Sequence, residues 1–133
     1  MTHLAGKVAI VTGSSKGIGA GIAERLARDG ASVVVNYARS EKEAAAVVDR
    51  IAAAGGQAVA VQADISRPEQ IQSLVDATLA RFGRLDILVN NAGTYRLDSL
   101  DTITPESVAE HFDLNVRGLL LMTQAAARVL PSG

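Results

Sequence analysis

Apolar residues along the chain gather in short unbroken runs that are separated by longer segments of mixed character. Residues 8–11 and 33–35 are such runs, the second within a strand predicted over residues 31–36, and their β-branched content is typical of strands covered on both faces of a parallel sheet. Short buried helical segments are the alternative, but the length and valine content of the runs argue against it. Residues 58–61 and 85–89 predict a third and a fourth strand.

The segments between these strands have helical spacing. Apolar residues recur every three or four positions within residues 18–26, 44–51 and 71–82, and a glycine follows each segment at position 30, 55 or 83. Because crossovers between parallel strands are right-handed, the alternation predicts an α/β fold in which four strands form a parallel sheet with helices on both faces.

Short polar motifs predict where two of these helices begin. Ser40 with Glu43, and Ser66 with Glu69, have the spacing of a capping box, in which two side chains bond the free N–H groups of the first turn. We therefore expect each serine to cap the helix that follows it.

The chain after the fourth strand loses its periodicity until residue 104. Residues 93–104 predict a loop at the carboxyl edge of the sheet, where ligands of such folds bind. Thr104 and Pro105 predict the start of a last helix. This helix is apolar nearly all round at residues 119–122, which predicts burial against more than one neighbour.

Glycines occupy the connection between the first strand and the first helix. Gly13, Gly17 and Gly19 have the spacing G-x-x-x-G-x-G. Glycine lets a backbone approach an anion closely, and a helix N-terminus presents free N–H groups and the positive end of its dipole. A turn with a helix cap needs no ligand, but the strand, glycine, helix and strand within one βαβ unit favour dinucleotide binding.

Composition narrows the possible functions. A chain of 133 residues has the size of one domain, and its net charge of −1 without a basic block argues against nucleic acid as a partner. It has no cysteine, and its two histidines have no partner pattern, so no metal site is indicated. We see no signal peptide or membrane span and expect a cytoplasmic protein.

Polar motifs follow the later strands. Asp64 comes after the third strand, residues 90–93 (Asn-Asn-Ala-Gly) after the fourth, and Asn115 lies in the last helix. Together with the glycine loop, these motifs resemble the short-chain dehydrogenase/reductase family over essentially all 133 residues. The resemblance implies a doubly wound Rossmann sheet. It also implies hydride transfer between a nicotinamide cofactor and the carbonyl or alcohol carbon of a small-molecule substrate.

The resemblance also implies which residues bind the cofactor. At the adenosine and pyrophosphate it places Gly13, Ser15, Lys16, Gly17, Ile18 and Gly19, and after the second strand it adds Tyr37, Ala38, Arg39 and Ser40. At the adenine it places Asp64 and Ile65, and at the nucleoside ribose it places Asn91, Ala92 and Gly93. The alternatives that involve no ligand are a polar strand end for Asp64 and, for residues 90–93, a tight turn that tolerates left-handed backbone.

The charge at the end of the second strand bears on the choice of cofactor. NAD sites place an acid there to bind the ribose hydroxyls, and we take Asn36, which is neutral, to occupy that position. Lys16 and Arg39, with the hydroxyl of Ser40, can meet a 2′-phosphate instead. The alternative is that both cations are solvated surface charges. The sequence predicts NADP(H), and residues 35–40 resemble NADP(H)-linked members such as 3-oxoacyl-carrier-protein and hydroxynaphthalene reductases.

The family's catalytic Tyr-x-x-x-Lys motif does not occur in these 133 residues. Of the family's catalytic residues, the resemblance carries over Asn115 alone, as a helix residue that interrupts local hydrogen bonding and helps to hold a proton-relay water. We therefore expect residues 1–133 to be the N-terminal part of a single dinucleotide-binding domain, truncated before the fifth strand, inactive alone and homo-oligomeric when intact. The alternatives are a nucleotide-binding module without catalysis and a regulatory nucleotide sensor.

Overall fold

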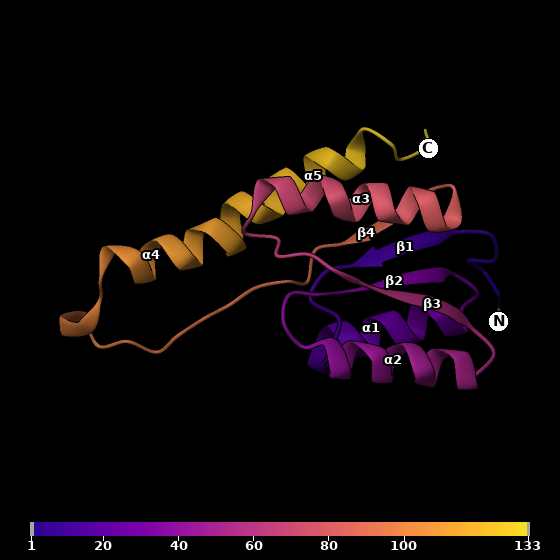
Figure 1. Ribbon diagram of the computed structural model, residues 1–133, viewed down its shortest axis with the longest axis horizontal. Coiled ribbons are helices and arrows are strands. Elements are labelled where there is room, and N and C mark those ends of the chain that lie inside the picture. Colours follow the sequence, from indigo (N-terminus) through magenta and orange to yellow (C-terminus); the bar gives the residue numbers. More distant parts are fainter. Residues whose placement is uncertain (1, 133) are drawn as a thin grey trace.

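Four parallel strands form one sheet in the computed structural model, which describes residues 2–132 (Figure 1). In spatial order they are β3 (Gln57–Gln62), β2 (Ser32–Tyr37), β1 (Val8–Val11) and β4 (Ile87–Val89). The predicted parallel α/β sheet is thus confirmed. Because β2 and β4 lie on opposite sides of β1, the strand order reverses there, and doubly wound folds bind ligands at such a switch point.

Two pairs of helices cover the faces of the sheet, α1 (Gly17–Arg28) with α2 (Glu41–Ala53) and α3 (Pro68–Phe82) with α5 (Leu119–Ala127) (Figure 1). Alternation along β2 divides the core between them, since Val33 and Val35 pack toward the first pair and Val34 toward the second. The expectation of helices on both faces is therefore confirmed.

The two predicted serine–glutamate capping boxes do not form. Ser40 is the N-cap of α2, but its backbone (φ −88°, ψ 64°) departs from the extended conformation of capping residues and its side chain makes no capping bond. Ahead of α3, the hydroxyl of Ser66 donates to Asp64 Oδ1 at 2.6 Å, and Arg67 becomes the N-cap. The start predicted at Thr104 is confirmed, since Thr104 forms a capping box with Ser107.

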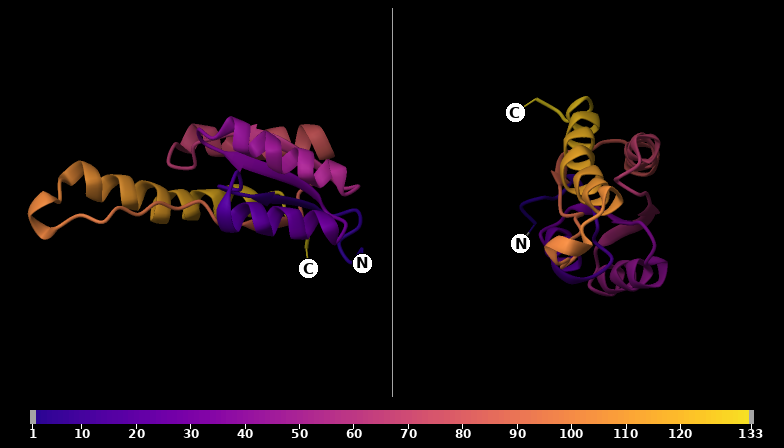
Figure 2. Two further views of the ribbon diagram at one scale, coloured as in Figure 1. Left: turned by 90° about the horizontal axis from the view of Figure 1, so that it is seen from below. Right: turned by 90° about the vertical axis from the view of Figure 1, so that its left-hand side faces the viewer.

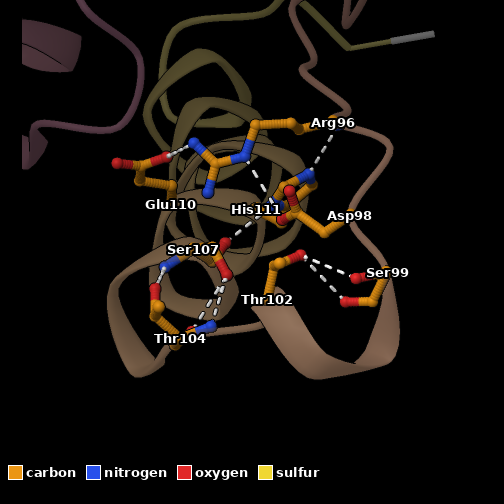
Figure 3. Close-up of polar contacts among 8 residues, drawn as sticks. All are labelled: Arg96, Asp98, Ser99, Thr102, Thr104, Ser107, Glu110 and His111. Carbon is orange, nitrogen blue, oxygen red and sulfur yellow. Dashed lines mark hydrogen bonds and ion pairs between the residues drawn. The ribbon is translucent and has the colours of Figure 1, made fainter.

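Residues 93–118 form an arm that extends beyond the sheet (Figures 1 and 2). The chain runs outward from β4 to the short 3-10 helix η1 (Leu100–Thr102), and α4 (Pro105–Phe112) returns beside it. The π-helical segment η2 (Asp113–Gly118) then joins α4 to α5. His111 links the two sides of the arm (Figure 3): its Nε2 accepts the Arg96 N–H at 3.0 Å, so its Nδ1 donates to the Ser107 carbonyl at 2.6 Å.

Residues 119–122, which the sequence predicts to be buried against more than one neighbour, are only partly buried within residues 2–132. Met122 is fully buried, whereas Leu119 and Leu120 are 40% and 61% exposed. The Met122 side of α5 packs with α3 against the sheet, but nothing within residues 2–132 covers the side that carries Leu120.

Candidate functional site

An open cavity of about 430 Å³ lies where the carboxyl ends of the strands meet the glycine loop. Most of the residues predicted to bind a cofactor line it, namely Gly13, Ser15, Lys16, Ala38, Arg39, Ser40, Asp64, Ile65, Asn91, Ala92 and Gly93. The residues predicted for the site that are outside this lining are Gly17, Ile18, Gly19, Tyr37 and Asn115. The fold therefore brings together segments that are far apart in the sequence.

The glycines of the loop serve different purposes. A Cβ on Gly13, whose φ is +60°, would lie 2.9 Å from the backbone of Ala92. A Cβ on Gly19 would lie 2.5 Å from both the Gly13 carbonyl oxygen and Asn91 Nδ2. Gly17 also has a positive φ of +61°, but a Cβ there would meet open space. Gly13 and Gly19 thus allow backbone segments to pack together, while Gly17 is required by its own conformation.

Thr12 fastens the segment after β4 to the glycine loop. Its Oγ1 accepts the backbone N–H groups of Asn91 at 3.0 Å and Ala92 at 2.9 Å. In return, Asn91 Nδ2 donates to the carbonyl groups of Thr12 and Gly13 at 3.1 and 2.9 Å. The sequence interpretation missed this role of Thr12. The signal that could have found it is a hydroxyl residue placed directly after a buried strand.

The turn proposed as an alternative for residues 90–93 is contradicted by their backbone. The structure describes all four residues, and none of them has a positive φ. The asparagines were therefore not selected for a left-handed turn. Asn91 instead uses its amide to hold the two loops together, and Asn90 donates to the Thr123 hydroxyl at 2.9 Å.

Asn36 borders the cavity, but its side chain has no free polar group to offer a ligand as the sequence argument assumed. Its side chain is buried, and its amide is bonded to the backbone of Gly13, Val61 and Ala63. Alternation along β2 explains the error, because it places Asn36 on the same face as Val34, the face that α3 and α5 cover. Tyr37 points to the opposite face, where it is half-buried against the core under α1 and α2.

Beyond the end of β2, residues 38–40 also line the cavity. Lys16 and Arg39 place positive charge there, and neither forms an ion pair within residues 2–132. The lining acid, Asp64, is already engaged: Oδ1 accepts from the backbone and hydroxyl of Ser66, and Oδ2 lies 3.7 Å from Arg67 Nε. The cavity is thus suited to an anion.

Asn115 lies in the π-helical segment and holds the chain as it leaves the cavity. Its Oδ1 accepts the Thr94 N–H at 2.8 Å, and its Nδ2 donates to the Thr94 carbonyl at 2.7 Å. The arm therefore fixes Gly93 and Thr94, both of which line the cavity. Within residues 2–132, no group of three or more His, Asp or Glu side chains is placed to bind a metal ion.

Comparisons with known proteins show what the chain is similar to. A family model for short chain dehydrogenases matches residues 7–133. An uncharacterized oxidoreductase of Methylorubrum extorquens is 56% identical over 133 residues, which are 100% of this chain and 54% of that protein. A hydroxynaphthalene reductase of Aspergillus fumigatus is 49% identical over 123 residues, which are 92% of this chain and 45% of that protein.

A solved structure extends the comparison to the fold. The crystal structure of a short chain dehydrogenase from Burkholderia cenocepacia in complex with NADP is 49% identical, with a TM-score of 0.93. The match covers 97% of this chain and 53% of that one. The chain thus spans about half the length of the relatives it matches.

Proposed function

Since the chain belongs to the short-chain dehydrogenase family, we propose that its cavity binds NADP(H). We also propose that the whole protein transfers a hydride between this cofactor and the carbonyl or alcohol carbon of a small-molecule substrate. The bound nicotinamide supplies or accepts the hydride. The residues of this chain bind and orient the nucleotide.

The charge of the cavity is the observation that carries the proposal. Lys16 and Arg39 are free to meet phosphate groups, while the Asp64 carboxylate is held by Ser66 and Arg67. The guanidinium of Arg39, with the neighbouring Ser40 hydroxyl, suits a 2′-phosphate because its N–H groups can bind two phosphate oxygens together. The NADP complex of the Burkholderia relative supports the same choice.

The glycine loop fits the pyrophosphate of such a nucleotide. Gly17 is the first residue of α1, and the space where its side chain would lie is open. Lys16 is the N-cap, and its side chain makes no capping bond to the helix. The free N–H groups and the dipole at this end of α1 therefore remain accessible to an anion.

Replacing Arg39 with alanine tests the assignment of the 2′-phosphate. We expect Arg39→Ala to weaken NADP⁺ binding roughly 10- to 100-fold, the worth of a hydrogen bond to a charged group, and to change NAD⁺ binding less than twofold. Calorimetric titration with each nucleotide measures both. Lys42→Ala is the matched control, because Lys42 is an exposed nearby cation outside the cavity. An unchanged ratio of NADP⁺ to NAD⁺ affinity in Arg39→Ala contradicts the assignment.

For residues 1–133 we propose the N-terminal part of a single dinucleotide-binding domain that binds without catalysing. The sequence has no Tyr-x-x-x-Lys, so little or no NADPH oxidation is expected from this chain alone. An assay of NADPH oxidation by the whole protein separates the enzyme from the two alternatives, a non-catalytic module and a nucleotide sensor. Oxidation of NADPH driven by a carbonyl substrate supports the enzyme, and nucleotide binding without turnover supports the alternatives.

We further propose a homo-oligomer in the cytoplasm. Phe112, Val116 and Leu120 are 59%, 46% and 61% exposed on the arm and α5, and such apolar surface favours association. No helix within residues 2–132 is long and apolar enough to cross a membrane. Light scattering of the whole protein and fractionation of its cells test the two proposals.

A further inference from the structure

The amide of Asn36 joins two segments that border the cavity. Its Oδ1 accepts the backbone N–H of Gly13 at 3.0 Å. Its Nδ2 donates to the carbonyl oxygens of Val61 at 3.2 Å and Ala63 at 3.1 Å. One side chain therefore bonds both the glycine loop and the chain leaving β3, although these segments are about 50 residues apart in the sequence.

The backbone of Asn36 strengthens the link to the glycine loop. Its N–H donates to the Ser14 hydroxyl at 3.1 Å, and its carbonyl accepts the Ser14 N–H at 2.8 Å. The Ser14 hydroxyl in turn donates to the Val11 carbonyl at 2.7 Å. The side chains of Asn36 and Ser14 are both almost completely excluded from solvent, so water cannot easily replace these bonds.

The bonded segments are the ones that a dinucleotide would span. Gly13 lines the cavity at the loop assigned to the pyrophosphate. Ala63 also lines it and directly precedes Asp64, which is assigned to the adenine. The spacing between these ends of the cavity thus depends on a side chain whose polar atoms are all occupied by protein groups.

We infer that Asn36 is a positioning residue, which sets the spacing between the glycine loop and the β3 end of the cavity and so controls nucleotide affinity without contacting the 2′-phosphate. The inference rests on the proposed function of the cavity. It assigns different effects to two residues of the same segment. Asn36 governs the affinity for NADP⁺ and NAD⁺ alike, whereas Arg39 governs the ratio between them.

The chemistry of an amide makes Asn36→Asp a sharp test. An aspartate retains an acceptor for the Gly13 N–H, but at neutral pH its carboxylate faces the Val61 and Ala63 carbonyl oxygens without a proton to donate. At lower pH the protonated carboxyl can donate to one of them, and burial favours this neutral form. Asn36→Asp therefore restores part of the link as the pH falls.

The measurement is the dissociation constant of each nucleotide for wild type and Asn36→Asp at pH 8 and pH 5.5. We expect the variant to bind NADP⁺ and NAD⁺ each about tenfold more weakly than wild type at pH 8, and the deficit to shrink at least threefold at pH 5.5. Dividing by the wild-type constant at each pH removes the effect of pH on the nucleotide and on the other groups that face the cavity, whose charged members are Lys16, Arg39 and Asp64.

Two controls separate positioning from loss of stability. Thr78→Val removes a fully buried hydroxyl that bonds the Leu74 carbonyl at 2.9 Å within α3, so it should lower stability and leave both affinities unchanged. Hydrogen exchange at the Gly13 amide should accelerate in Asn36→Asp at pH 8 beyond the change in Thr78→Val. If Asn36→Asp fails to fold, Asn36→Ser replaces it, with about tenfold weaker binding of both nucleotides expected at either pH.

Three outcomes would overturn the inference: equal affinity of variant and wild type, a loss confined to NADP⁺, or a Gly13 amide that exchanges as in wild type. Failure of the wild-type chain to bind either nucleotide would instead contradict the proposed function. In that case the exchange of the Gly13 amide still shows whether Asn36 holds the loop.

Discussion

Asp86 connects the first and fourth strands through one carboxylate. Its Oδ2 accepts the Val8 N–H at 2.9 Å, and Oδ1 lies 2.6 Å from a guanidinium nitrogen of Arg84. The hydrogen bond from Arg84 lowers the pKa of Asp86 below its ordinary value of 3.8, helped by the bond from Val8 and opposed by desolvation. Because the folded-state pKa is the lower one, this stabilisation is present above about pH 4 and is lost as the pH falls further.

We expect Asp86→Asn to reduce the free energy of unfolding by about 1 kcal/mol at pH 7. The difference in the free energy of unfolding between wild type and variant should narrow as the pH falls below 4, because wild type then loses the same charge. Denaturant titrations between pH 7 and pH 2.5 measure this difference. Asp49→Asn, at an exposed acid on α2, is the control, and a deficit independent of pH would contradict the role of the charge.

Two glycines of α1 provide a matched pair for the packing of the loop. A Cβ on Gly19 would collide with Gly13 and Asn91, whereas a Cβ on Gly21 would meet nothing within 4 Å. We expect Gly19→Ala to destabilise the fold by more than about 2 kcal/mol, and Gly21→Ala to stabilise it by about 0.5 to 1 kcal/mol through helix propensity. Thermal or denaturant unfolding distinguishes them, and similar effects of both substitutions would refute the close packing.

Several residue roles could be predicted from the sequence, and others depended on contacts that it does not display. The glycine loop, Arg39 and Asp64 stand in local patterns that predict a nucleotide site, and the structure places Gly13, Lys16, Arg39 and Asp64 around one cavity. Thr12 and Asn91 act across 79 positions, so no local signal shows their pairing. The direction of Asn36 depended on where β2 begins, because a shift of one residue exchanges the two faces of a strand.

At the scale of elements, two side chains act as hydrogen-bonding clasps on the arm, beside an ion pair of 3.7 Å between Arg96 and Glu110. Asn115 bonds both polar groups of the Thr94 backbone near the cavity, while His111 accepts the Arg96 N–H farther out (Figure 3). Asn115 lies within the π-helical segment, from which its amide reaches the Thr94 backbone.

Removing each clasp should release its own amide. We expect Asn115→Ala to raise hydrogen exchange at Thr94 about tenfold, the equivalent of about 1.4 kcal/mol, with little change at Arg96. His111→Ala should give the reverse pattern. Exchange measured residue by residue tests both, and an arm that loosens as a whole in either variant would show that the clasps are not independent.

The elements themselves were predicted well because strand and helix patterns are local. The capping boxes at Ser40 and Ser66 failed, since capping also requires an extended backbone at one site and an uncommitted hydroxyl at the other. At Thr104 both conditions are met and the capping box forms. Spacing alone could not separate these cases.

At the scale of the molecule, a sheet core with two covered faces carries an arm that projects beyond it (Figure 2). The core followed from the alternation of strands and helices. The exposure of residues 119–120 depends on what is present to cover them, and an apolar pattern alone does not report that. The cavity lies between these two parts, bordered by the glycine loop and by the segment that begins the arm.

The proposed function depends on a cavity that selects a phosphorylated adenosine. Calorimetric titration of the 133-residue chain with NADP⁺ and NAD⁺ under identical conditions measures this selectivity. We expect NADP⁺ to bind at least about tenfold more tightly, since Arg39 and Lys16 meet a phosphate that NAD⁺ lacks. Equal affinity for the two nucleotides, or no binding of either at millimolar concentration, would contradict it.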